Sequence, residues 1–432
     1  MAKADQLVNE IEQQIRTGQL APGDRLPSVR EFAATRGLAP NTAAAVYKTL
    51  ASRGLVQGEG RRGTFVAAKP AVRVHIDEPV PADLVNVANG NPDPSLLPDL
   101  TAALARVPAD PLLYGREQIL PELAQLLRDD VEADGIDADE LAVVAGALDG
   151  IERVLAAHLR PGDSVGIEDP GYSSVTELVT AMGFRPVPVQ VDGQGPDPTA
   201  LVEAIDRGVA AVIITPRAQN PIGATISGER AEALRRIFEA EPHVLVIEDD
   251  HAGPVSGAAH ETTIPEGAPH WAVVRSVAKS LGPDLRVSAL VGDATTVGRV
   301  RGRQAVGTGW VSHILQHAVV AMLTAPGHGQ LIDRAAVTYS ERRAAFVDRL
   351  RAGGVDVEAS SGLNVWIPVA DEAAVVAGME RRGFAIRSGV RYRLDAPPGV
   401  RVTIAGTDAA VLVDVADALV DVLRPATHRR VV

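Results

Sequence analysis

The chain has 432 residues, of which 46% are hydrophobic and 22% are charged, a balance typical of globular proteins rather than disordered chains. At roughly 100 to 200 residues per domain, this length predicts two or three domains. The absence of cysteine excludes disulfides, thiolate zinc sites and cysteine nucleophiles. Since neither a signal-peptide pattern nor an apolar run of about 20 residues is evident, we expect a soluble cytoplasmic protein without a membrane partner.

The net charge of -13 is distributed unevenly along the chain. Residues 1–66 hold nine Lys and Arg against six Asp and Glu, a local charge of +3, so the remaining residues carry -16. A small basic segment on a large acidic body predicts contact with nucleic acid at one end of the chain only.

The first sixty residues contain three segments of helical periodicity. An apolar stripe from Leu7 to Ile15 predicts a first helix, which ends before the turn sequence "APGD". Ser28 and Glu31 have the spacing of a capping box and predict the start of a second helix, which Gly37 ends. A third helix is predicted in the sequence that follows.

The third helix begins at Pro40, which suits a first helical position, and ends at Gly54. The stretches "LVQ" and "TFV" then read as two short strands around the basic turn "GEGRRG". Helix, turn, helix and basic wing is the outline of a winged helix-turn-helix.

The third helix has properties that suit a DNA major groove. Ala43 to Ala45 are small enough to enter without steric conflict, Asn41 and Thr42 can donate to phosphates or base edges, and Lys48 adds charge. Two arginines at the tip of the predicted wing can reach the minor groove or the backbone. The candidate DNA-contacting residues are Arg30, Pro40, Asn41, Thr42, Tyr47, Lys48, Arg61 and Arg62.

This segment resembles the GntR family of bacterial regulators, whose "LPSxREL" and "GxGTFV" signatures appear here as "LPSVREF" and "GRRGTFV". The resemblance implies a DNA-binding domain, with Arg30 at that family's phosphate-binding arginine position. Without the resemblance, the pattern also permits a helical dimerisation module with an incidental basic hairpin.

After a proline-bearing stretch without helical periodicity, apolar runs alternate with helical segments. The runs "LAVVAG", "SVGIE", "VAAVIITP" and "HVLVIEDD" are typical of strands, and alternation with helices predicts a mostly parallel sheet with ligands outside the carboxyl ends of the strands. Polar or helix-opening residues accompany three of these runs and a further run, "WAVVRSV": Gly146, Ala147 and Leu148; Asn220; Asp249 and His251; and, with the further run, Ser276, Lys279 and Arg286.

These residue types match the groups of pyridoxal 5'-phosphate. A helix opening with free amides, a serine and an arginine can bind a phosphate, and a lysine amine can form an imine with an aldehyde. A carboxylate keeps a pyridine nitrogen protonated. The sequence therefore predicts pyridoxal phosphate as the cofactor and no metal site.

The same region resembles the fold type I aminotransferases, because "SVAKSLGPDLR" matches the "SxSKxLxPxxR" segment of that family. The resemblance places the internal aldimine on Lys279, the partner of the pyridine nitrogen at Asp249, and the amide that binds the ring hydroxyl at Asn220. It also implies roles for Tyr172 as the ring-stacking aromatic, Tyr114 as an aromatic reaching the phosphate in the neighbouring subunit, and Arg401 as the arginine for a substrate carboxylate.

Three positions depart from the family pattern. His251 stands where a tyrosine usually binds the ring oxygen, and titration of its imidazole near neutral pH would make tuning of the cofactor less certain. The phosphate segment reads "GALDG" without the usual serine and glutamine side chains, and "NPIG" has isoleucine for threonine. We expect these changes to weaken turnover more than binding.

The two halves together are identified as a member of the MocR subfamily of GntR regulators. We predict a winged helix-turn-helix over residues 1–68, a linker over 69–86 and an α/β aminotransferase class I/II-like domain with a smaller C-terminal α+β subdomain over 87–425. The resemblance implies a head-to-tail homodimer that binds promoter DNA and senses an amine, an amino acid or the cofactor itself.

Two alternatives are an active aminotransferase with an accessory DNA-binding module and a repressor that binds no cofactor. The second conflicts with the presence of Lys279, Asp249, Asn220 and Arg286.

Overall fold

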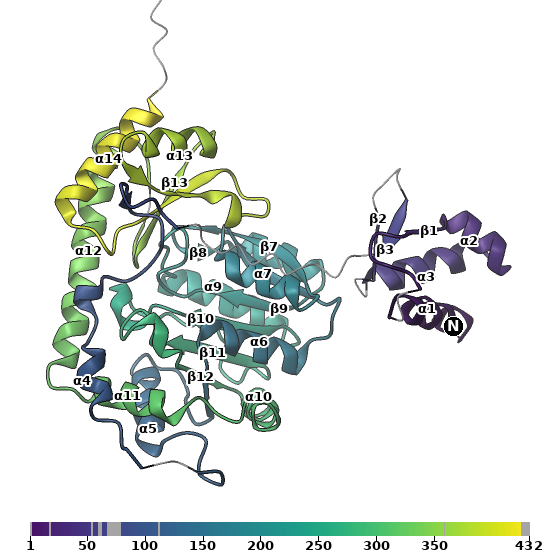
Figure 1. The fold of residues 1–432 in the computed structure, drawn as a ribbon, viewed down its shortest axis with the longest axis horizontal. Coiled ribbons are helices and arrows are strands. Elements are labelled where there is room, and N and C mark those ends of the chain that lie inside the picture. The colour runs from purple at the N-terminus through teal and green to yellow at the C-terminus, as the bar shows by residue number, and fades with distance from the viewer. Residues whose placement is uncertain are drawn as a thin grey trace, which may run out of the picture. The chain divides into compact units, whose positions relative to one another are not determined.

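The computed structural model divides the chain into a small N-terminal unit and a large unit that holds most of the remaining residues. Figure 1 shows the elements of both. Within the described residues, none of the helices combines the length and the apolar composition that a membrane span requires. The structure describes residues 2–16, 19–52, 55–58, 63–66, 79–110, 113–357 and 359–424.

The N-terminal unit has the helix, turn, helix and wing order predicted from the sequence. In its small sheet, β3 lies between β1 and β2 and pairs antiparallel with both. Arg61 and Arg62, at the predicted wing tip, lie outside the described residues. The described elements of this unit are α1 (Ala2–Arg16), β1 (Arg25–Leu26), α2 (Val29–Arg36), α3 (Pro40–Ser52), β2 (Val56–Gly58) and β3 (Thr64–Val66).

Local hydrogen bonds set both ends of α2. Ser28 Oγ accepts from the Glu31 amide at 3.2 Å, and Glu31 Oε2 accepts from the Ser28 amide at 2.8 Å. At the other end, Gly37 adopts a left-handed conformation, with φ of 60°, and its amide returns to carbonyls of the last turn. The capping box and the glycine stop predicted from the sequence are therefore confirmed.

The core of the N-terminal unit includes two residues that the sequence had suggested for DNA contact. Ala43 is fully buried and Tyr47 is 6% exposed. The Tyr47 hydroxyl donates to the Pro27 carbonyl at 2.7 Å, and its ring meets Phe32 edge to face with centroids 5.3 Å apart. Burial raises the pKa of Tyr47 to about 12. The assignment of Tyr47 to the DNA surface is therefore wrong, because α3 turns this side chain inward.

An eight-stranded sheet forms the centre of the large domain, with the order β5-β12-β11-β10-β9-β6-β7-β8. β9, β10 and β11 run parallel, whereas β12 is antiparallel to both β11 and β5. The predicted α/β fold is confirmed, although β12 was not among the predicted strands. The strands are β5 (Leu141–Val144), β6 (Ser164–Asp169), β7 (Arg185–Asp192), β8 (Gly195–Pro196), β9 (Val209–Ile214), β10 (Leu245–Asp250), β11 (Trp271–Ser276) and β12 (Ser288–Gly292).

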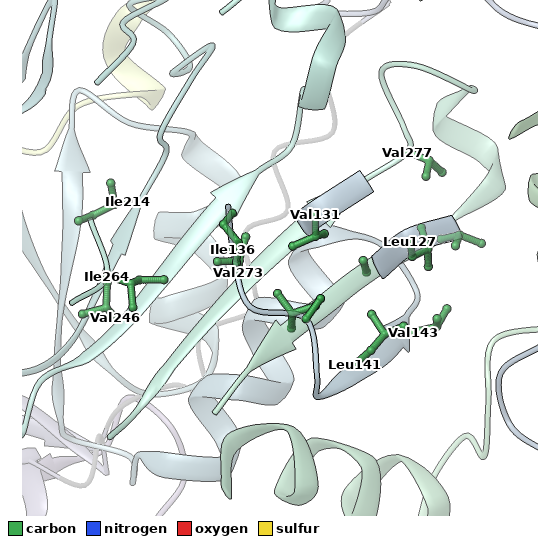
Figure 2. Close-up of a cluster of buried hydrophobic side chains, with 14 of the residues drawn as sticks. Leu127, Val131, Ile136, Leu141, Val143, Ile214, Val246, Ile264, Val273 and Val277 are labelled. Atoms are coloured by element: carbon green, nitrogen blue, oxygen red, sulfur yellow. The ribbon is translucent and has the colours of Figure 1, made fainter. Parts of the chain in front are cut away.

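Helices cover this sheet and supply its main apolar core. Figure 2 shows Leu127 and Val131 of α5 together with Val143, Val246 and Val273, which share one face of the sheet. The helices of this part are α4 (Leu100–Leu104), α5 (Pro121–Glu132), α6 (Ala147–His158), α7 (Ser173–Ala181), α8 (Pro198–Asp206), α9 (Gly228–Ala240), α10 (Ala294–Val306) and α11 (His313–Leu323).

The smaller subdomain has its own core around the sheet β13-β16-β15. The long helix α12 packs against α14 along this subdomain (Figure 1). Its elements are α12 (His328–Ala352), β13 (Asn364–Pro368), α13 (Glu372–Glu380), β14 (Phe384–Ala385), β15 (Arg387–Ser388), β16 (Gly399–Thr403) and α14 (Ala409–Leu423).

The predicted linker over residues 69–86 overlaps the large domain at its end. Residues 67–78 lie outside the described ranges, but β4 (Val85–Asn86) pairs in parallel with β14. The last two residues assigned to the linker are thus part of the large domain, because they pair with β14. A strand of two residues is too short to be predicted from the sequence.

Replacing Tyr47 with phenylalanine removes the hydroxyl that donates to Pro27. Loss of this hydrogen bond should lower the stability of the N-terminal unit by about 1 kcal/mol, because typical intramolecular hydrogen bonds contribute that much. Amide hydrogen exchange of α2 and α3 in the full chain should therefore accelerate about fivefold. Loss of DNA binding at unchanged exchange would show instead that the hydroxyl contacts DNA.

Candidate functional site

The candidate cofactor residues gather at one edge of the central sheet. Asp249 ends β10 and Ser276 ends β11, and parallel strands place their carboxyl ends at the same edge. Lys279 follows three residues after β11. Because β12 is antiparallel to β11, Arg286 enters this same edge from the loop before β12. The antiparallel strand therefore completes the site that the parallel strands begin.

Lys279 is half-buried and directed toward the loop near residue 90. Its Nζ donates to the Gly90 carbonyl at 2.8 Å. Burial and the positive charge of Arg401 lower the pKa of Lys279 to about 8. A substantial fraction of this amine is therefore neutral, and hence nucleophilic, in slightly alkaline solution.

Asp249 is 4% exposed, and within the described residues its Oδ1 has no hydrogen-bond partner. Burial, together with the negative charges of Asp250 and Glu168, raises the pKa of Asp249 to about 7. A buried carboxylate oxygen without a donor is unfavourable unless a ligand supplies one. The protonated nitrogen of a pyridine ring is such a donor, so this residue fits pyridoxal phosphate.

His251 does not titrate near neutral pH, contrary to the sequence-based expectation. Burial and the positive charge of Lys279 lower its pKa to about 4, although Asp250 acts in the opposite direction. The imidazole is therefore neutral at physiological pH, with one ring nitrogen able to donate and the other to accept. The expected interference of its titration with the cofactor is removed by its surroundings.

A helix N-terminus and an arginine meet beside these residues. Gly146 precedes α6 with φ of 102°, and a side chain at this position would collide with the guanidinium of Arg286. The exposed Arg286 donates to the Ala145 carbonyl at 2.9 Å. The positive end of the helix dipole and the guanidinium together favour an anion.

The other residues proposed for the phosphate lie at the same edge. Ser276 is 6% exposed, and its hydroxyl accepts from the Ala278 amide at 3.2 Å. Ala147 and Leu148 form the first turn of α6 and bring backbone amides but no polar side chains.

Arg401 and Asn220 are joined directly. Arg401 Nη1 donates to Asn220 Oδ1 at 3.1 Å, and Nη2 donates to the Ala88 carbonyl at 2.5 Å. The guanidinium also lies 4.9 Å from the centre of the Tyr392 ring. These contacts fix Arg401, which is 4% exposed, close enough to Lys279 to lower the pKa of its amine.

The two predicted aromatics are exposed. Tyr172, just after β6, is 38% exposed, and Tyr114 is 92% exposed with its ring edge to face on Trp310. Such exposure leaves the Tyr114 ring available to a second subunit. The single chain does not bring it to the residues described above.

Sequence reasoning missed a buried ionic network on the opposite face of the sheet. Asp250 accepts from Arg217 and Arg275, with Nε to carboxylate distances of 3.0 and 2.7 Å. His260 lies between Asp250 and Glu248, at 3.4 and 2.8 Å. Although burial opposes both effects, these contacts raise the pKa of His260 to about 9 and hold that of Asp250 well below its usual value.

This network has the residue types of a metal site but the geometry of an ion-pair network. Ligand atoms of Asp134, Asp250 and His260 lie within 4.8 Å of one another. The same carboxylate oxygens accept from the guanidinium groups of Arg217 and Arg275. The positive charges needed to balance the acids are therefore already present in the protein.

The described DNA-facing candidates lie in α2, at Arg30, and at the start and on the exposed face of α3. Arg30, Asn41 and Lys48 are exposed and Thr42 is partly exposed. Arg25, which was not among the predicted DNA-contacting residues, is exposed beside the wing strand, and its Nε would lie 2.9 Å from a Cβ at Gly63. Its position on β1 became apparent only when β1 was seen to pair with β3.

Two family models match the chain in separate regions. The model for aminotransferase class I and II matches residues 82–419, and the model for bacterial regulatory proteins of the gntR family matches residues 3–66.

Curated relatives and a solved structure match the chain over different lengths. The vitamin B6 salvage pathway transcriptional repressor PtsJ of Salmonella typhimurium is 38% identical, covering 93% of this chain and 94% of that protein. The pyridoxine biosynthesis transcriptional regulator PdxR of Corynebacterium glutamicum is 30% identical over 57% of this chain and 55% of its own length. A crystal structure of an archaeal alanine:glyoxylate aminotransferase has a TM-score of 0.72 at 21% identity, covering 79% of this chain and 90% of that one.

Replacing Asp249 with asparagine should stabilise the cofactor-free protein in a pH-dependent way. The pKa of about 7 in the folded protein lies above the ordinary aspartate value of 3.8, so the stability linked to this proton is present below pH 4 and is lost as pH rises through 7. The advantage of Asp249→Asn should therefore grow between pH 4 and 7 to a few kcal/mol and then level off. Urea midpoints across this range measure it, and a constant difference would show that Asp249 stays ionised.

Proposed function

Because the chain belongs to the aminotransferase class I and II family and carries a gntR-family DNA-binding domain, the architecture of the MocR subfamily of transcription regulators, we propose that its large domain binds pyridoxal 5'-phosphate and that this binding controls DNA recognition. The observation that carries the proposal is the buried Asp249 carboxylate oxygen, which has no donor within the described residues. The same edge of the sheet carries Lys279, whose pKa is about 8.

The residues at the sheet edge divide into three groups by chemistry. Lys279 holds the cofactor aldehyde, and Asp249 accepts from the ring nitrogen. Asn220 and the neutral His251 donate toward the ring oxygen, since Asn220 Oδ1 already accepts from Arg401. The bound cofactor supplies an electrophilic carbon that reacts with amines.

The phosphate group is held by Arg286, Ser276 and the first amides of α6, which form the anion-binding part of the edge. Tyr172 stacks on the ring. An amino acid that competes with Lys279 for the cofactor places its carboxylate against Arg401, whose orientation is fixed by Asn220 and Ala88.

The signal is the cofactor itself, and the regulated genes serve vitamin B6 metabolism. The 38% identical relative is named as a repressor of vitamin B6 salvage, and the relative at 30% identity is named for pyridoxine biosynthesis. Cofactor binding can change the fraction of protein bound to DNA only if the cofactor has different affinities for the DNA-binding arrangement of the protein and for the arrangement that does not bind DNA. The protein acts in the bacterial cytoplasm, where its DNA is located.

The active form is a homodimer. Tyr114, at 92% exposure, reaches the phosphate site of the second subunit, and paired DNA-binding domains read two half-sites. Asn41 and Thr42 at the start of α3 contact base edges, while Arg30 and Lys48 contact phosphates. Arg61 and Arg62 are proposed for the wing contact.

Mixing the purified protein with pyridoxal phosphate should produce an absorption band in the violet that Lys279→Ala abolishes. Borohydride reduction should add the cofactor mass to the peptide that contains Lys279, and the assignment is direct because the chain has only four lysines. Asp249→Asn should retain the fold but bind the cofactor more weakly. A band of wild-type intensity in Lys279→Ala would refute the site.

Binding to the DNA upstream of its own gene should depend on salt through the basic N-terminal domain. Lys48→Ala should reduce the slope of log affinity against log salt by about 1, because one phosphate contact is lost. Arg381→Ala, which removes an exposed charge from the large domain, is the control and should leave the slope unchanged.

Footprints of the same DNA with and without pyridoxal phosphate test the coupling. A footprint that changes with the cofactor supports a sensor. If the footprint responds only to an added amino acid, the signal is an amine effector, and if it responds to neither, the coupling proposal is wrong.

A further inference from the structure

Ser288 is the first residue of β12, and its side chain is fully buried. Within the described part of the chain, its hydroxyl has no hydrogen-bond partner. Buried hydroxyl groups are nearly always paired with protein, water or ligand. The position of Ser288 therefore requires an explanation beyond packing.

The sheet register places Ser288 beneath the N-terminus of α6. In β12, Ser288 lies directly opposite Val144 on β5 and directly opposite Ser276 on β11. Residues directly opposite each other in an antiparallel pair point to the same face. A Cβ at Gly150, in the first turns of α6, would lie 3.1 Å from Val144 Cγ2, so this is the face that α6 covers.

Three other anion-binding features surround this position. Arg286 is two residues earlier in the chain and lies over Gly146, at the start of α6. Ser276 is the cross-strand neighbour and also carries a buried hydroxyl. The helix opening itself offers amides but, with Ala147 and Leu148, no side-chain donor.

We infer that the Ser288 hydroxyl donates a hydrogen bond to the phosphate group of the bound cofactor, as an additional phosphate ligand supplied by the antiparallel strand. The inference rests on the proposed binding of pyridoxal phosphate. Under this inference, β12 contacts the phosphate through Ser288, and the loop before β12 contacts it through Arg286.

The test compares three ligands on the cofactor-free full chain by isothermal titration calorimetry: pyridoxal phosphate, pyridoxal and inorganic phosphate. Ser288→Ala should weaken pyridoxal phosphate and inorganic phosphate about tenfold, because a hydrogen bond to a charged group is lost. Binding of pyridoxal, which lacks the phosphate, should not change. Ser288→Cys keeps the shape of the side chain but replaces the hydroxyl with a slightly larger thiol that donates poorly, and should bind the phosphate ligands as weakly as Ser288→Ala.

Thr296→Val is the matched control. Thr296 is also fully buried, but its hydroxyl is already used, by Asp293 at 2.5 Å and by His158 at 2.8 Å, on the helix that follows the far end of β12. Thr296→Val should lower the urea midpoint and leave the affinity for pyridoxal phosphate unchanged. Ser288→Ala should leave the urea midpoint unchanged, because the hydroxyl it removes has no partner among the described residues, and should weaken the binding of pyridoxal phosphate.

The outcomes separate the two proposals. Wild-type protein that binds no pyridoxal phosphate overturns the proposed function and the role of Ser288 with it. Wild-type binding that Ser288→Ala leaves unaltered overturns the role of Ser288 alone. Equal weakening of pyridoxal and pyridoxal phosphate also overturns it, because the hydroxyl would then act on the ring or on the fold rather than on the phosphate.

Discussion

Two adjacent carboxylates at the end of β10 point to opposite faces of the central sheet, and the remainder of the site is organised around this division. The register pairs Asp249 with Val274 and Asp250 with Arg275, so alternation along the strand separates the two side chains. Asp250 is saturated by two arginines and a histidine, whereas Asp249 Oδ1 has no partner within the described residues. One carboxylate is therefore held within an ion-pair network, and the other is buried with an oxygen that no described residue contacts by a hydrogen bond.

The ionic network also explains how an unpartnered carboxylate is maintained. Burial and the negative charge of Asp250 raise the pKa of Asp249, while His260, Arg217 and Arg275 hold the pKa of Asp250 well below its usual value despite its burial. Removing one partner from a buried ion pair is strongly destabilising, so these arginines hold the ends of β10 and β11 in place. Arg217 also lies in the loop after β9 that carries Asn220, so the network anchors two of the segments that form the candidate site.

In the N-terminal unit, one helix likewise has a buried face that packs in the core and an exposed face. In α3, Ala43 and Tyr47 face the core, while Asn41 and Lys48 face outward. The inward positions hold the helix against Phe32 of α2, which fixes the outward positions relative to the wing strands. Recognition by this unit therefore depends on the packing of residues that do not themselves reach DNA.

The sequence alone determined the order of the elements and the identity of most candidate residues. Ser28, Glu31 and Gly37 act through neighbours within a few residues, so the ends of α2 could be read directly. The lysine segment and the polar residues after successive strands could be predicted to lie at one edge of the sheet, because parallel strands bring their carboxyl ends together whatever their order in the sheet.

Only the tertiary structure decided which side chains are available and which pKa values are shifted. Helical periodicity did not reveal that Tyr47 turns inward, and the composition near His251 did not show that burial beside Lys279 keeps its imidazole neutral. Ser288 belongs to a strand that pairs with segments more than 140 residues away at Val144 and only 12 away at Ser276. Burial and charge depend on such cross-strand neighbours, and no local pattern contains them.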